Sequence, residues 1–124
     1  MIWSVLTLLA IYGLVCFILV SLHESLHFIA AKLFHLRPVF KINQFLMPAV
    51  SYKNPGRDAQ NLVVTLSAPV GLIILGMLLD SEIPYFGLAK ILCLTNVANL
   101  LPITTDGEVI FLSVYNLIKE KKTK

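Results

Sequence analysis

Residues 2–22, IWSVLTLLAIYGLVCFILVSL, carry no charged side chain, and HESLH follows them directly at positions 23–27. An uncharged apolar run of this length predicts a membrane-crossing helix, since about 20 such residues span the ~30 Å hydrocarbon core. We expect the helix to continue to about Phe34, with Lys32 and Arg37 marking its basic end. Ionisable groups are costly inside such a helix and usually serve a function. The stretch therefore predicts a polar site within the membrane but near one surface.

His23, Glu24 and His27 form the pattern H-E-x-x-H. Residues four apart lie on one face of a helix, roughly 6 Å from each other. Two imidazoles so placed can bind one Zn²⁺, and the adjacent Glu24 can act as general base on water at the metal. The pattern is short and also occurs by chance, so the interpretation depends on its position at the end of an apolar run.

The composition is that of an integral membrane protein. The chain has 124 residues, of which 57% are hydrophobic and 14% charged, whereas soluble domains average about 25% charged residues. This length predicts a single domain, 1–124. No Arg/Lys-rich face with interleaved aromatic residues is evident, so we expect no nucleic-acid partner. Cys16 and Cys93 lie in apolar runs and are interpreted as packing residues. Cys16 shares the face of His23, but seven residues of helix place it roughly 10 Å away, too far to share a metal.

Residues 37–57 differ in character, with four basic residues, no acidic residue and three prolines. Two segments within them partly alternate polar and apolar side chains, as strands do. The pattern predicts a β-hairpin at the membrane surface at about residues 38–54. An irregular amphipathic loop is the alternative.

Three further apolar stretches complete the predicted fold. A second helix is expected at 61–79, a third at 84–101 ended by Pro102, and a short last helix at 109–118. The predicted fold class is an all-α integral membrane protein with three transmembrane helices plus a short C-terminal helix, embedded in the lipid bilayer.

The basic residues predict an orientation. Residues 32–57 contain five of them and the tail contains four, whereas the turn at 80–83 contains none. By the positive-inside rule, 32–57 and the C-terminus face the cytoplasm, and the turn and the N-terminus face out.

Asp106 is the candidate third metal ligand. A catalytic zinc site commonly has three protein ligands, and two histidines leave it one short. Asp106 follows the break at Pro102 and lies at a depth similar to that of the histidines. The alternative is that Asp106 is the N-cap of the last helix, with Glu108 in its first turn.

HESLH in a membrane helix, with Asn99-Leu100-Leu101-Pro102 leading to Asp106-Gly107, resembles the site-2 protease family of intramembrane zinc metalloproteases. The bacterial sporulation-factor processing enzymes belong to that family. The resemblance covers nearly the whole chain in order. It implies a three-helix catalytic core in a bacterial cell membrane, one Zn²⁺ per chain held by His23, His27 and Asp106, and Glu24 as the base. The implied activity is that of a zinc metalloendopeptidase acting on membrane-spanning or membrane-associated substrates.

The chain departs from the family pattern at three places. The spacing from Pro102 to Asp106 is one residue shorter than is common, and Glu108 replaces a frequent second glycine. The family's G-P-x-x-N-like motif reads Ala68-Pro69-Val70-Gly71-Leu72, without the Asn that is associated with the substrate carbonyl. Asn96 or Asn99 is the expected substitute in supporting the substrate or the oxyanion.

Two other classes of function remain open at this stage. One is a non-catalytic membrane protein of the same fold, such as an immunity or regulatory factor. The other is a small membrane subunit that binds or transports metal. Neither the substrate nor the oligomeric state follows from the sequence.

Overall fold

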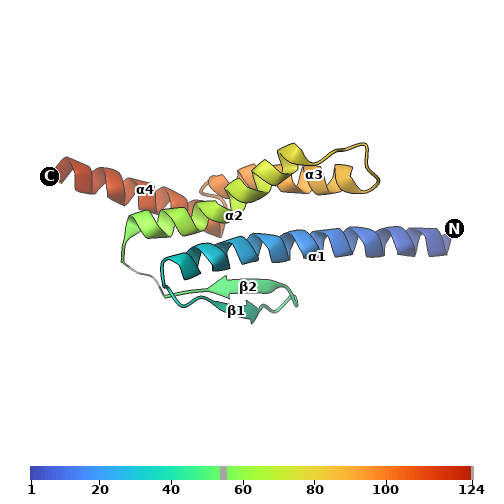
Figure 1. Cartoon of the computed structure of the whole chain (residues 1–124), viewed down its shortest axis with the longest axis horizontal. Coiled ribbons are helices and arrows are strands. Elements are labelled where there is room, and N and C mark those ends of the chain that lie inside the picture. Colours follow the sequence, from blue (N-terminus) through green and yellow to red (C-terminus); the bar gives the residue numbers. More distant parts are fainter. Residues whose placement is uncertain (54–55, 124) are drawn as a thin grey trace.

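The computed structural model describes residues 1–53 and 56–123. Helix α1 lies between a two-stranded hairpin on one side and α2 on the other, and α3 and α4 continue one after the other along α2 (Figure 1). The elements in chain order are α1 (Ile2–Leu33), β1 (Val39–Ile42), β2 (Pro48–Ser51), α2 (Asp58–Leu78), α3 (Phe86–Leu94), the 3₁₀ helix η1 (Thr95–Leu100) and α4 (Thr105–Thr123).

Helices α1 and α2 are each long and apolar enough to cross a membrane. With 32 and 21 residues, they are about 48 Å and 31 Å long at 1.5 Å per residue. The third crossing, expected as one helix over 84–101, is different. It qualifies only as a bent pair, in which α3–η1 and α4 meet at 41°. Pro102, which has no backbone N–H and cannot continue a helix, lies in the break. The last helix also begins earlier and ends later than the expected 109–118.

The ends of the elements alternate between the two ends of the molecule. The N-terminus and the α2–α3 connection lie at one end, and the C-terminus lies at the other, beyond the basic end of α1 (Figure 1). α1 and the α3–η1–α4 line therefore run in the same direction, and α2 runs against both. This is the alternation that three crossings require.

Small side chains allow α1 and α2 to pack closely. Ala30 and Ala31 of α1 and Val64 and Ala68 of α2 are all buried. Gly71 also belongs to this contact, since a Cβ there would press against the side chain of Leu26. By contrast, none of the most apolar 18-residue window of α1 is buried within the protein. Such an exposed apolar surface is expected where lipid, rather than protein, is the neighbour.

The predicted hairpin is present, and it lies beside α1. β1 and β2 pair antiparallel with Phe40 opposite Val50, and the hairpin runs back beside α1 (Figure 1). The Val50 N–H donates to Glu24 Oε2 at 2.9 Å, about 14 Å before the end of α1 at Leu33. An unpaired strand edge needs hydrogen-bond partners, and Glu24 provides one inside the fold. Residue 54, the end of the range predicted for the hairpin, lies outside the described residues.

Lys90 of α3 caps the C-terminal end of α2. Its Nζ donates to the carbonyls of Gly76 at 2.9 Å and Leu79 at 3.0 Å. A cation there satisfies carbonyls that lack helical donors and opposes the negative end of the helix dipole. Gly76 allows the two helices to approach, since a Cβ at that position would lie 2.8 Å from the Cβ of Cys93.

Candidate metal centre

His27 is held by a backbone carbonyl of α2. Its Nδ1 lies 2.9 Å from the carbonyl oxygen of Val64. Because a carbonyl can only accept, Nδ1 carries the hydrogen and donates, and in the neutral ring Nε2 presents a lone pair. Pro69, inside α2, has no N–H for the carbonyl of Thr65, so the helix hydrogen bonding is already interrupted in the turn next to Val64.

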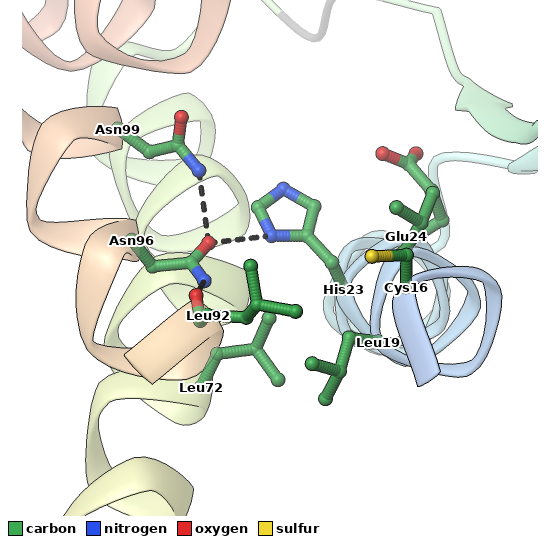
Figure 2. A pocket seen from close by; sticks show the side chains of 9 residues that line it. Cys16, Leu19, His23, Glu24, Leu72, Leu92, Asn96 and Asn99 are labelled. Atoms are coloured by element: carbon green, nitrogen blue, oxygen red, sulfur yellow. Dashed lines mark hydrogen bonds between the residues drawn. The ribbon is translucent and has the colours of Figure 1, made fainter. Parts of the chain in front are cut away.

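His23 is held in the same way by a side chain. Its Nδ1 lies 3.2 Å from Asn96 Oδ1. The orientation of this amide is fixed because Asn96 Nδ2 donates to the carbonyls of Leu92 at 3.2 Å and Cys93 at 3.1 Å. Asn99 Nδ2 donates to the same Oδ1 at 2.9 Å (Figure 2). His23 Nδ1 is therefore the donor to Asn96, and its Nε2 is the atom left to bind something else.

Asp106 lies against both imidazoles. Its Oδ2 is 3.0 Å from His23 Nε2 and 3.2 Å from His27 Nε2. The two rings stand edge to face, with centroids 4.8 Å apart. Ligand atoms around a tetrahedral zinc, with bonds of about 2.0–2.1 Å, are roughly 3.3 Å from one another. The three atoms are of the types that bind zinc, and the two nitrogen–oxygen distances match the separation expected between ligands of one zinc.

The turn before α4 places the Asp106 carboxylate. The Gly107 N–H donates to Thr104 Oγ1 at 3.1 Å, which makes Thr104 the N-cap of a helix that begins at Thr105. The alternative prediction, that Asp106 is itself the N-cap, is therefore wrong. Gly107 is required at its position, since a Cβ there would overlap the carbonyl of Leu101. Glu108 is exposed and does not take part in the site.

Glu24 lies beside the histidines. Ligand atoms of His23, Glu24 and His27 all fall within 4.8 Å of one another, so this cluster could hold a metal ion. Asp106 Oδ2 lies within 3.2 Å of both Nε2 atoms. Glu24 Oε2 already accepts a hydrogen bond from the N–H of Val50. Asp106 therefore lies in contact with both imidazoles, and Glu24 lies beside them.

Sequence reasoning missed the groups that hold the ligands. The carbonyl of Val64 and the N–H of Val50 are backbone atoms, which leave no sequence signal. Thr104 could have been found, because a threonine just before an acidic first turn is a known N-cap signal. Asn96 was predicted as support for the substrate, yet both of its amide hydrogens are used within the protein. Asn99 lies at the site with one of its amide hydrogens donated to Asn96.

No protein-family model, curated protein or solved structure matches the chain.

Proposed function

We propose that the protein is an intramembrane zinc metalloprotease of the site-2 protease type, with one Zn²⁺ per chain bound by His23, His27 and Asp106. The observation that carries the proposal is that Asp106 Oδ2 lies within 3.2 Å of both the His23 Nε2 and the His27 Nε2 atoms. Each Nδ1 hydrogen is already donated elsewhere, so three acceptor atoms face one another. Acceptors so arranged need a cation among them. Protons on the rings would also satisfy them, so metal analysis is the first measurement.

The bound zinc would supply Lewis-acid chemistry, polarising the scissile carbonyl and lowering the pKa of water at the site. Glu24 takes the proton of the attacking water and passes it to the nitrogen of the leaving amine. The Val50 N–H binds only Oε2 of Glu24. Among the described residues Oε1 has no hydrogen-bond donor, so it is the oxygen we assign to proton transfer.

The proposed substrate is a membrane-spanning or membrane-associated peptide. The site is set in the longest apolar helix, and the outer edge of β2 faces Glu24 through the Val50 N–H. An extended peptide that added a strand to this edge would pass the base, because peptides commonly bind sheet edges in this way. Asn99 supports the substrate carbonyl with its remaining amide hydrogen. We place the protein in a bacterial cell membrane, with 32–57 and the C-terminus cytoplasmic.

Glu24→Gln tests the proposed chemistry. The amide keeps an oxygen for the Val50 N–H but cannot accept a proton at neutral pH. Purified wild type and variant should each bind one zinc per chain. The variant should cleave a panel of membrane-spanning peptides at least about 10²-fold more slowly, the usual contribution of a positioned acid–base group. The doubly substituted His23→Ala/His27→Ala protein should bind no stoichiometric zinc.

The outcomes separate the three classes of function. Unchanged cleavage by Glu24→Gln would refute the mechanism, and zinc retained by the double histidine variant would place the metal elsewhere. Zinc bound by a wild type that cleaves no peptide would favour the non-catalytic protein of the same fold. Zinc flux through the protein in sealed vesicles would favour a transport subunit.

A further inference from the structure

A cavity of about 320 Å³ lies beside the candidate metal centre, with His23 and Glu24 in its wall. It lies between α1 on one side and α3 with η1 on the other, with Leu72 of α2 at its base (Figure 2). Its remaining lining residues are Cys16, Leu19, Val20, His23 and Glu24 of α1 and Leu92, Asn96 and Asn99 of α3–η1.

The two ends of the cavity differ in polarity. Since α1 and α3–η1 run in the same direction (Figure 1), residues early in each element lie together at one end. Cys16, Leu19 and Leu92 make that end apolar. The hydrogen bond between His23 and Asn96 spans the other end, which is polar. The apolar end points along α1 toward its uncharged N-terminal part, and so toward the membrane interior.

We propose that this cavity binds about three residues of the substrate, extended and aliphatic, on the membrane-interior side of the scissile bond. This inference rests on the proposed function and names the substrate segment that the site selects. Seven residues of helix separate His23 from Cys16, roughly 10 Å along the axis. An extended chain advances about 3.3 Å per residue, so three residues cover that length.

An extended conformation follows from the chemistry. A carbonyl inside a helix is already hydrogen-bonded to the N–H four residues later, so the scissile carbonyl must leave the helix to meet the site. The unwound residues beside it then need a place other than lipid, because lipid cannot satisfy free backbone groups.

The aliphatic preference follows from the walls. Leu19, Leu72 and Leu92 offer no hydrogen bond, so a polar substrate side chain would be desolvated without a partner at the apolar end. We expect leucine-like residues to bind there and serine or asparagine to be rejected.

Cys16 is a native reporter for the apolar end. In Glu24→Gln protein, single-cysteine membrane-spanning peptides are oxidised with copper phenanthroline, with the cysteine moved one residue at a time to either side of the bond that wild type cleaves. Disulfide cross-linking to Cys16 should peak about three residues from that bond, on one side only. Cys93, which is completely buried, should remain unlinked, and Cys16→Ser should abolish the product.

A bulk test uses two neighbouring residues. Leu19 lines the cavity, whereas Ile18 beside it is 53% exposed and does not. Two peptides are compared that differ only at the third residue from the scissile bond on its membrane-interior side, which is leucine in one and alanine in the other. Leu19→Phe should lower the ratio of the cleavage rate of the leucine peptide to that of the alanine peptide by roughly tenfold. Ile18→Phe should leave this ratio unchanged.

These experiments distinguish an error in the proposed substrate cavity from an error in the proposed protease function. A peptide that wild type cleaves but that never cross-links to Cys16, or that cross-links equally at every position, would overturn the cavity and leave the function standing. A peak about seven residues from the bond would mean a helical substrate and overturn the extended segment. Cross-linking confined to one stretch of the peptides, when wild type cleaves no peptide of the panel, would support the cavity and refute the protease.

Discussion

His23 and His27 differ in what fixes each ring. The acceptor for His27 is the Val64 carbonyl, a backbone group that no substitution removes. The acceptor for His23 is Asn96 Oδ1, which can be deleted. Asn96 is therefore a positioning residue, and it allows the orientation of one ligand to be tested separately from the ligand itself.

Asn96→Leu should weaken zinc binding by about 10- to 100-fold, the usual cost of losing the partner of a metal-bound histidine. Asn96→Asp keeps an acceptor for Nδ1 and should retain more of the affinity. Competition with a chelator measures the affinity. The absorption spectrum of the cobalt-substituted protein reports the ligand geometry, which a general loss of stability would not alter in the same way. Wild-type affinity and spectrum in Asn96→Leu would show that His23 needs no such support.

At the scale of elements, the candidate metal centre depends on a turn rather than on a helix face. Residues 101–104 bring α4 to α1, and their path requires the missing Cβ of Gly107. Asp106 reaches the histidines because this turn holds the first residues of α4 in place. A change at Gly107 should therefore affect the metal through the backbone.

Gly107→Ala should destabilise the protein by about 1–3 kcal/mol, as overpacking does, and should lower zinc affinity by moving Asp106. Gly13→Ala is the matched control, since a Cβ at Gly13 meets nothing within 4 Å. The melting temperature and zinc affinity of both variants, measured in the same detergent, check this. Equal behaviour of the two variants would contradict the role of the turn.

The hairpin is attached to the candidate metal centre through Glu24. Glu24→Ala removes the acceptor of the Val50 N–H, whereas Glu24→Gln retains one. Amide hydrogen exchange at Val50 should therefore be faster in Glu24→Ala and near wild type in Glu24→Gln, because a freed amide becomes open to water. Equal exchange in all three proteins would mean that Glu24 does not hold the strand.

Some of these elements could be predicted from the sequence, and others could not. The uncharged run to Leu22 and the pattern at 23–27 predicted α1 and its polar face, and alternation predicted the hairpin. The position of the hairpin beside α1 could not be predicted, because it depends on one backbone N–H meeting one carboxylate. The third crossing was expected over 84–101, whereas the structure has α3, a 3₁₀ turn and a break before α4, which apolar composition does not reveal. The Asp106 side chain meets the histidines in space, although 79 and 83 residues separate them.

For the whole molecule, the apolar surface and the polar groups lie in different places. The most apolar part of α1 is unburied, while the polar groups gather where α1, α2 and η1 meet. At about 48 Å, α1 exceeds a hydrocarbon core of about 30 Å, so part of it projects or tilts. His23 lies ten residues before the end of α1, about 15 Å along the axis. The site is therefore separated from the basic end of α1 by about half the thickness of a hydrocarbon core.

The topology provides the last prediction. Helix α2, about 31 Å long, matches one crossing, and Arg57 and Ser81 lie just beyond its two ends, both exposed. Basic residues gather beside Arg57 and are absent from 80–83, so Arg57 should face the cytoplasm and Ser81 the outside. In a Cys16→Ser/Cys93→Ala background, Arg57→Cys and Ser81→Cys should react with an impermeant maleimide from opposite sides of sealed vesicles. Labelling of both from one side would mean that α2 does not cross, and it would contradict the three-crossing topology in which His23, His27 and Asp106 meet within the bilayer.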